Sequence, residues 1–202
     1  VKITVIMAIK RYGINLRNAL DSLKNQTLRD IEIILCDAAS TDETAEVMKS
    51  YLGDSRFSYI RLEDDSISAA RNHCIDIAKG KYIAFCDKNV VFSKNLLSRL
   101  YECAEQEQAD LCIAPMASSD IYGKHEFSST GILSRRQKID KFDTDIIWNP
   151  AVTNKLFLKS KLDEKGIRFR KYGKAREAAF SIPCAFESDN ITVSSKGLVS
   201  YI

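Results

Sequence analysis

Short apolar runs alternate with stretches of helical periodicity along the first half of the chain. Ile3–Met7 is rich in β-branched residues and predicts a buried strand. Leu16, Leu20 and Leu23 then recur at helical spacing and predict an amphipathic helix over 14–25. The alternation continues through four more apolar runs that we predict as strands: Ile31–Cys36, Phe57–Leu62, Tyr82–Cys86 and Ala109–Pro115.

Three further helices are expected between these strands. Ser40 followed by Glu43 is typical of a capping box, which predicts that a helix opens there and carries Val47 on its apolar face. Helical periodicity also predicts helices over 67–78 and Leu96–Gln106. Strands that alternate with helices in this way predict βαβ units and a mostly parallel sheet, whose ligands bind beyond the carboxyl ends of the strands.

The pattern after residue 115 is less regular. We expect a hairpin or loop excursion there, before Asn149–Phe157. The 202 residues show no second core, so they predict a single domain, 1–202. Because the chain begins almost inside a strand and stops on another strand-like run, Leu198–Ile202, we expect this domain to be cut from a longer protein.

The amino-acid composition limits the expected binding partners and the cellular compartment of the protein. The net charge is only +3, from 30 basic and 27 acidic residues without a long single-sign block, so nucleic acid is not an expected partner. The six cysteines are scattered and form no CxxC pair, which predicts buried free thiols and a reducing, cytoplasmic location. No run approaches the ~20 apolar residues that span a bilayer.

Acidic residues follow two of the predicted strands directly. Asp37 comes after the run 31–36, and Asp87 comes after the run 82–86. Ions such as Mg²⁺ hold phosphates through one or two carboxylates, so both positions suit a metal-bound diphosphate. An aspartate at the end of a strand is also common as a simple turn residue. Spacing alone leaves these two interpretations open.

Several segments together resemble family 2 glycosyltransferases in their order and spacing. They are Val5–Met7 with Leu16–Thr27, Ile31–Asp42, Ser68–Asn72, Gly80–Asp87, and Asn154–Phe157 with Gly166–Phe169. The resemblance implies a GT-A-type three-layer α/β sandwich, in which a mostly parallel central sheet is flanked by helices. It also implies a nucleotide-binding half, 1–115, and an acceptor-side half, 116–202.

A reaction is implied by the same resemblance. A sugar passes, with inversion, from a nucleotide-diphosphate donor of the UDP type to a cell-surface polysaccharide or a glycolipid. A carboxylate deprotonates the acceptor hydroxyl, and Mn²⁺ or Mg²⁺ neutralises the departing diphosphate. Carried onto this chain, the general base is Glu177, the metal ligands are Asp87 and Asn89, and the nucleotide-binding residues are Ala8, Lys10, Asp37, Arg71 and Lys88.

The donor-side motifs depart from the family's pattern. Ala8–Arg11 stands where the family has Pro-x-Tyr-Asn. The sequence Asp-Ala-Ala-Ser at 37–40 stands where the family has Asp-Asp-Gly-Ser. Ala38 occupies the position of the second aspartate, which resembles the residue that contacts uracil, so that carboxylate is missing. Asp-Lys-Asn at 87–89 replaces Asp-x-Asp, so we expect metal binding to be weakened or lost.

The acceptor-side motif is altered as well. Arg-Glu-Ala-Ala-Phe at 176–180 replaces Glu-Asp-x-x-Phe, so Glu177 is one methylene longer than the aspartate it replaces. A misplacement of ~1 Å can cost ~100-fold in rate. We also expect Pro183 to interrupt the helix that this segment should form.

Different functions therefore remain open. One is metal-dependent transfer, and another is metal-free binding of the nucleotide by basic side chains. The rival is a catalytically degenerate pseudo-glycosyltransferase that binds or scaffolds a partner. Nucleotidylyl transfer shares the fold type, but no Gly-rich phosphate loop follows the first strand. Some basic residues would attract an anionic acceptor or the inner face of the membrane, or form a solvated face: Arg135, Arg136, Lys171, Lys174 and Arg176.

Overall fold

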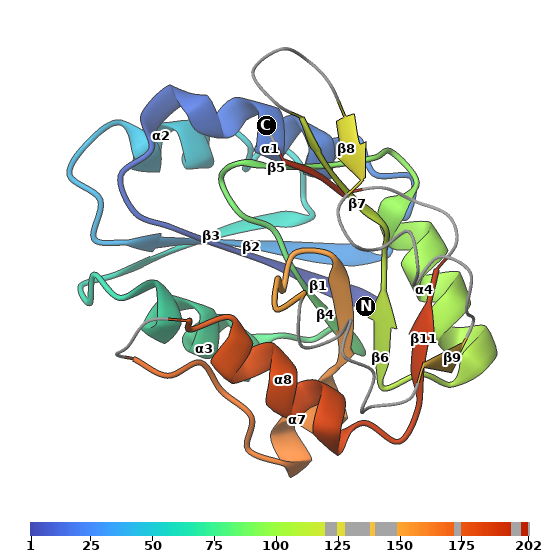
Figure 1. Cartoon of the computed structure of the whole chain (residues 1–202). Helices are drawn as coiled ribbons and strands as arrows, with labels where there is room; N and C mark the ends of the chain where they lie inside the picture. Colours follow the sequence, from blue (N-terminus) through green and yellow to red (C-terminus); the bar gives the residue numbers. More distant parts are fainter. Residues whose placement is uncertain (120–124, 128–137, 140–148, 172–174, 195–198, 202) are drawn as a thin grey trace.

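The computed structural model describes residues 1–119, 125–127, 138–139, 149–171, 175–194 and 199–201. Helices and strands alternate through the first half, as expected (Figure 1). Its elements are β1 (Ile3–Ile9), a 3₁₀ turn η1 (Gly13–Leu16), α1 (Arg17–Lys24), β2 (Ile31–Ala38), α2 (Thr44–Lys49), β3 (Phe57–Leu62), α3 (Ile67–Ile77), β4 (Tyr82–Phe85), β5 (Val90–Phe92), α4 (Leu96–Glu107) and β6 (Leu111–Ile113). The elements that follow are β7 (Met116–Ser119), β8 (His125–Phe127), β9 (Lys138–Ile139), β10 (Lys155–Leu158), α7 (Lys159–Glu164), α8 (Ala178–Glu187), β11 (Ile191–Val193) and β12 (Val199–Tyr201).

Eight of the described strands form the central sheet, in the order β3-β2-β1-β4-β10-β6-β11-β9. The strands β3, β2, β1 and β4 are parallel, with Ile3 of β1 opposite Ile31 of β2 and Tyr82 of β4. The strand β10 is antiparallel to both of its neighbours, and β11 is again parallel to β6. The predicted mostly parallel sheet is confirmed, and β10 brings a segment from late in the chain into its middle.

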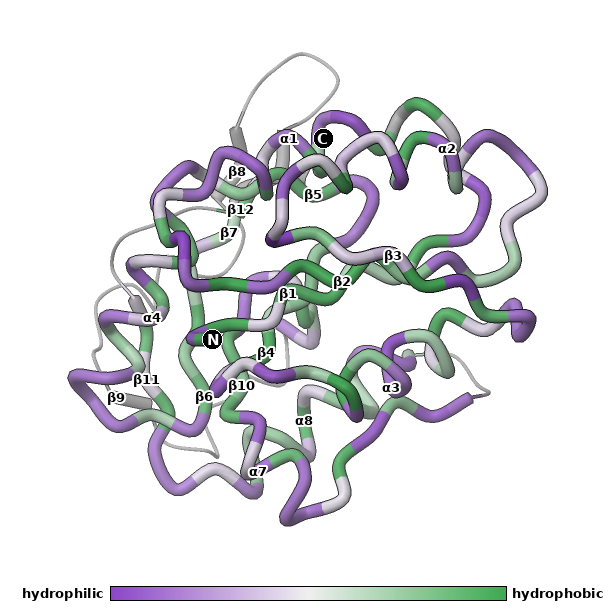
Figure 2. The backbone as a smooth tube through the Cα atoms, turned by 180° about the vertical axis from the view of Figure 1, so that it is seen from behind, coloured by the Kyte–Doolittle hydropathy of each residue, from purple (hydrophilic) through white to green (hydrophobic). Residues whose placement is uncertain are grey.

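Helices cover both faces of this sheet, and each face encloses its own core (Figure 1). One core, which includes Met7 and Leu97, lies between the sheet and α1, α2 and α4. The other includes Ile6, Phe85 and Phe180 and lies between the sheet and α3, α7 and α8. Successive residues of β1 point into opposite cores, because side chains alternate across a strand. Figure 2 shows the hydrophobic colour of these central strands. The GT-A-type three-layer arrangement is confirmed.

A smaller sheet lies on the α1 side, with the strand order β5-β12-β7-β8. Its strand β5 packs against α1, where the amide of Phe92 donates to the hydroxyl of Ser22 at 3.1 Å. The strands β7 and β8 are antiparallel neighbours, so the hairpin expected after residue 115 is confirmed. Within the described residues, no helix is long and apolar enough to cross a lipid bilayer.

Two expectations about helices are corrected. The capping box at Ser40 is wrong, because α2 begins only at Thr44 and Glu43 occupies its N-cap without a side-chain bond. Ser40 instead belongs to the turn after β2, where its amide donates to Asp37 Oδ1 at 2.9 Å and its hydroxyl accepts from the Arg11 amide at 3.0 Å. Short polar side chains can bond backbone groups in turns as well as in helix caps, and Ser40 forms its bonds in the turn.

The helix-breaking role expected for Pro183 is also wrong. This proline lies inside α8, which continues to Glu187. A proline removes one helical hydrogen bond and crowds the preceding turn. Phe180, Cys184 and Ala185 are buried in the core beneath α3 and the sheet, and this burial holds the helix together across the proline.

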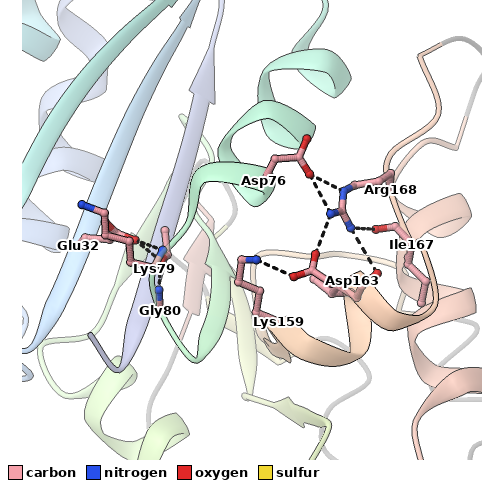
Figure 3. A network of polar contacts seen from close by, with 10 residues as sticks. Glu32, Asp76, Lys79, Gly80, Lys159, Asp163, Ile167 and Arg168 are labelled. Carbon is pink, nitrogen blue, oxygen red and sulfur yellow. Dashed lines mark hydrogen bonds and ion pairs between the residues drawn. The ribbon is translucent and has the colours of Figure 1, made fainter.

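A closed polar network occupies the amino-terminal edge of the sheet (Figure 3). The Thr4 hydroxyl donates to Glu32 Oε1 at 2.5 Å and accepts from the Gly80 amide at 2.8 Å. The amide of Lys79 donates to the same Glu32 oxygen at 2.6 Å. These bonds join the starts of β1, β2 and β4 in one chain of contacts, which we call the Glu32 network.

A second network at the same end connects α3 with the later part of the chain (Figure 3). Arg168 donates through Nη2 to Asp76 at 2.8 Å and to Asp163 at 2.7 Å. Lys159 adds an ion pair to Asp163 at 2.6 Å. We call this group the Arg168 network, and it fixes α7 and the segment after it against the end of α3.

Candidate active site

A cavity of about 470 Å³ opens at the carboxyl ends of β1 and β4. Its wall is built from the end of β1, the first turns of α3, the loop after β4 and the start of α8. Most of the predicted site residues meet here although they are far apart in the sequence. Those in the wall are Ala8, Lys10, Arg71, Asp87, Lys88 and Glu177.

Arg71 lies between the two carboxylates of this cavity. Its Nη1 donates to Glu177 Oε1 at 3.2 Å, and its Nη2 lies 3.6 Å from Asp87 Oδ2. The guanidinium also lies against the rings of Phe169 and Phe85, 5.0 and 5.8 Å from their centroids. The Arg71 side chain is 7% exposed, whereas Asp87 and Glu177 are 37% and 33% exposed. A buried cation therefore positions two carboxylates that remain open to the cavity.

Glu177 occupies the N-cap of α8. Its Oε1 is taken by Arg71, while Oε2 forms no hydrogen bond with any residue that the structure describes. A carboxylate at a helix amino terminus is favoured by the helix dipole. Glu177 thus keeps one carboxylate oxygen available to a hydroxyl in the cavity.

The predicted metal ligands are engaged with groups of the protein. Asp87 Oδ1 accepts from the Lys88 amide at 2.7 Å, and Asn89 Oδ1 accepts from the Tyr12 hydroxyl. The Lys88 ammonium lies 4.3 Å from the centre of the Tyr12 ring. Among the described residues, no three His, Cys, Asp or Glu side chains gather in a metal-binding arrangement. One carboxylate shared with Arg71 and one amide oxygen bonded to Tyr12 make a poorer site for a divalent cation than the two carboxylates of the family's Asp-x-Asp.

Asp37 is not part of the cavity wall. Its side chain is fully buried, and Oδ2 accepts from the Tyr59 hydroxyl at 2.9 Å and from Arg61 at 2.7 Å. Burial raises the pKa of Asp37, but the hydrogen bonds from Ser40 and Tyr59 and the charge of Arg61 outweigh it, so the pKa lies below its usual value. The predicted contact of Asp37 with the nucleotide stays a prediction.

The turn after Asp37 keeps a backbone shape that favours glycine. Ala39, which stands at the glycine of the family's Asp-Asp-Gly-Ser, has a φ of 52°. A left-handed conformation costs an alanine more than a glycine. The amide of Ala39 donates to Leu62 O at 3.1 Å, which helps to hold this conformation. The backbone of this turn therefore has the left-handed shape that a glycine would favour, although an alanine occupies it.

A buried lysine lies against the loop 149–154 beside the cavity, and the sequence pattern did not single it out. Lys155 is 1% exposed and donates to three oxygens of the loop 149–154 at 2.5–3.0 Å. Burial lowers the pKa of Lys155 to about 7, partly offset by the negative charge of Glu177. Pro150 of this loop lines the cavity, and its carbonyl accepts from Ser181 of α8 at 2.8 Å. Lys155 thereby fixes one wall of the site.

Two of the basic residues predicted to bind or attract anions already form ion pairs with aspartates of the protein. Lys10 forms an ion pair with Asp65 at 2.5 Å, and Lys171 forms one with Asp64 at 2.8 Å. Arg176 lines the cavity. The other three predicted cations fall outside the described residues: Arg135, Arg136 and Lys174.

Similarity to known proteins agrees with this architecture. The chain is 29% identical over 201 residues to the poly(ribitol-phosphate) β-N-acetylglucosaminyltransferase TarP of Staphylococcus aureus, covering 96% of this chain and 60% of TarP. The chain thus spans less than two thirds of the length of this relative.

Solved structures share the fold. The S. aureus protein TarS, in the crystal structure of its residues 1–349, matches with a TM-score of 0.88 at 20% identity, covering 100% of this chain and 60% of that one. The same TarS fragment in complex with UDP-GlcNAc matches with a TM-score of 0.85 at 19% identity, covering 100% of this chain and 59% of that one. The mannosyltransferase PcManGT of Pyrobaculum calidifontis, in complex with GDP-Man and Mn²⁺, matches at 0.75 and 16% identity, covering 98% and 56%.

A family model decides the assignment. The model described as glycosyl transferase family 2 matches residues 4–166, which include β1 through α7 and the cavity residues from Ala8 to Pro150. The rest of the cavity wall, at 175–178, lies beyond the end of this match. The chain therefore belongs to glycosyl transferase family 2.

Proposed function

We propose that this domain transfers a sugar, with inversion, from a UDP-type nucleotide-diphosphate donor to a hydroxyl of a cell-surface polysaccharide or a glycolipid. The observation that carries the proposal is the placement of Glu177 beside Asp87 in one cavity, with Arg71 between them. The relative TarP, named for transfer to poly(ribitol-phosphate), and the TarS complex with UDP-GlcNAc support this choice of donor and acceptor class.

The donor would lie with its diphosphate near the start of α3. Ile67 and Ser68, the first residues of this helix, line the cavity, so the positive end of the helix dipole faces it. Lys10 and Lys88 line the same space and add positive charge. An anionic leaving group is stabilised by such fixed charges as its bond to the sugar breaks.

Glu177 is assigned the role of general base. The acceptor oxygen attacks the anomeric carbon from the face opposite the diphosphate, and the bond from that carbon to the diphosphate oxygen breaks. The electron pair leaves with the diphosphate, and the hydroxyl proton passes to Glu177 Oε2. The bond from Arg71 to Oε1 orients the carboxylate for this step.

We place the reaction in the cytoplasm, at the inner face of the membrane when the acceptor is a glycolipid. All six cysteines are free, which supports a reducing compartment. The exposed Arg176 at the cavity would favour an anionic acceptor or lipid surface.

The proposal is tested by a Glu177→Gln variant with UDP-GlcNAc as donor. Removing the general base should lower the rate of UDP release by about 10²–10⁴-fold, while the affinity for UDP is unchanged. The rate is measured as UDP release with and without a glycan acceptor, and the affinity by titration calorimetry.

The matched control is Glu187→Gln, because Glu187 lies at the other end of α8 and pairs with Lys165 at 3.3 Å. This variant should turn over donor like the unmodified chain. If neither UDP nor UDP-sugar binds at millimolar concentration, the transferase function is wrong, and a binding or scaffolding role replaces it.

A further inference from the structure

The donor site carries more positive than negative side chains. Four cations line the cavity, Lys10, Arg71, Lys88 and Arg176, against the two carboxylates of Asp87 and Glu177. Four minus two leaves +2 for the lining residues, and Asp65, the ion-pair partner of Lys10, lowers this sum to +1. A diphosphate in water carries about two to three negative charges, so the side chains around the cavity offset part of that charge without another ion.

Lys88 is the best placed of these cations. Lys10 is paired with Asp65, and Arg71 is shared between Asp87 and Glu177. In contrast, Lys88 and Arg176 form no ion pair within the described ranges, and Lys88 is half-buried at the cavity whereas Arg176 is exposed. Its ammonium keeps its charge available for a ligand.

Neighbouring residues hold Lys88 in place. Its ammonium lies over the Tyr12 ring, and the Tyr12 hydroxyl donates to Asn89 Oδ1. The amides of Tyr12 and Gly13 both donate to Thr44 Oγ1, at 2.8 and 2.9 Å, which fixes the loop that carries the ring. Asn89, which we expected to hold a metal, instead bonds to the tyrosine whose ring lies under the Lys88 ammonium.

We propose that the diphosphate of the donor is neutralised by Lys88 and the neighbouring cations rather than by a divalent metal. This inference rests on the proposed function and concerns the same site. As the bond from the sugar to the diphosphate breaks, the electron pair left on the diphosphate oxygen is stabilised by the Lys88 ammonium, a compact point charge suited to phosphate. Asp87 keeps its role as a partner of Arg71.

The test is calorimetric titration of UDP into the chain in EDTA, and again in Mn²⁺ or Mg²⁺. We expect the same Kd in all three conditions. Lys88→Met should weaken UDP binding by about 10–100-fold, the worth of one charge-assisted contact, and Lys88→Arg should recover part of the loss. Thermal denaturation confirms that each variant is folded.

A matched control is Lys49→Met. Lys49 also places its ammonium over a tyrosine, 4.9 Å from the Tyr59 ring centre, but it does not line the cavity. This variant should bind UDP like the unmodified chain.

Restoring the second carboxylate gives the converse experiment. In the double variant Lys88→Met with Asn89→Asp, the missing cation is replaced by a site with two carboxylates. We expect Mn²⁺ to tighten UDP binding in this variant and not in the unmodified chain.

Two results would count against these ideas, and they differ. If EDTA abolishes UDP binding to the unmodified chain and Mn²⁺ restores it, the metal-free site is wrong while the proposed function stands. If UDP fails to bind in every condition, the proposed function itself is wrong.

Discussion

The two edges of the central sheet use similar polar residues in different ways. At the amino-terminal edge, Glu32 accepts from the Thr4 hydroxyl and the Lys79 amide, so the groups satisfy one another (Figure 3). At the carboxyl-terminal edge, the buried Arg71 holds Glu177 while leaving that carboxylate one third exposed to a cavity. One edge is closed, and the other keeps hydrogen-bonding capacity for a ligand.

This difference follows from the direction of the strands. In a parallel sheet the carboxyl ends of the strands point to one edge, where the loops diverge and leave room for a ligand. At the opposite edge, the parallel strands β1, β2 and β4 begin close together, and their polar groups pair locally. Substitutions at the closed edge should therefore change stability, and substitutions at the open edge should change binding and turnover.

The largest effect at the closed edge is expected for Gly80→Ala. A Cβ at this position would lie 2.3 Å from the Thr4 nitrogen and 2.7 Å from the Ile3 carbonyl carbon, both backbone atoms that cannot easily move. We expect the free energy of unfolding to fall by about 3 kcal/mol, as in other overpacked sites. Chemical denaturation measures this loss, and UDP affinity of the folded variant should be unchanged.

Gly53→Ala is the control for that experiment, because a Cβ there has no atom within 4 Å. It should leave stability unchanged or raise it by up to about 1 kcal/mol, since alanine has less freedom in the unfolded chain. A Gly80→Ala variant that folds normally but loses UDP affinity would break the distinction between the two edges.

An intermediate effect on stability is expected for Asp37→Asn. Asp37 lies at the open edge, but its carboxylate accepts hydrogen bonds from Tyr59 and Arg61 of the protein itself, so it resembles the residues of the closed edge. At neutral pH the variant should be about 2 kcal/mol less stable, as a buried charge-assisted hydrogen bond is lost. The pKa of Asp37 lies below its usual value, so its stabilising effect is present above about pH 4 and disappears as the pH falls through the lowered pKa.

The measurement is denaturation of both proteins between neutral and acidic pH. The gap between them should begin to close as the pH falls below about 4, where the aspartate of the unfolded chain becomes protonated, and close further as the pH falls through the lowered pKa of the folded protein. An equal gap at pH 3 and pH 7 would show that the charge of Asp37 contributes nothing. A weaker affinity of the folded variant for UDP would instead group Asp37 with the binding residues.

The sequence predicts the first half of this fold well because its strands are long enough to show a pattern. Ile3–Met7 and Ile31–Cys36 lie within β1 and β2, and their apolar runs reflect burial on both faces. The strands β9 and β11 have two and three residues, too few to establish a period. The position of β10 between β4 and β6 depends on tertiary pairing that no local pattern carries.

Prediction of the site was limited in a related way. Family motifs identified the residues that line the cavity, but they say nothing about which of these residues pair. The contact of Tyr12 with Asn89 spans 77 positions, and that of Arg71 with Glu177 spans 106. The family's Pro-x-Tyr-Asn, aligned with Ala8–Arg11, places its tyrosine at Lys10, so no motif pointed to Tyr12. The burial of Lys155 was not predicted either, because a lysine in an apolar run ordinarily indicates an exposed position.

The smallest effect on stability is expected for Arg168→Ala. This variant tests whether a change at the closed edge alters activity at the open edge. Arg168 pairs with Asp76 and Asp163, but these partners are 59% and 40% exposed, so the loss of unfolding free energy should be about 1 kcal/mol or less. Screening should shrink this loss further in 1 M salt, which denaturation at two salt concentrations measures.

The segment that carries Arg168 leads directly to the site. Its next residue, Phe169, exchanges two hydrogen bonds with Asn72, at 2.8 and 2.9 Å, and stacks on Phe180 of α8 with ring centres 4.0 Å apart. These contacts hold the segment against α3 independently of Arg168. We therefore expect Arg168→Ala to turn over UDP-GlcNAc at the unmodified rate, as should the surface control Arg99→Ala. A selective fall in turnover for Arg168→Ala would mean that the closed edge sets the position of Glu177, and that the two edges act as one unit.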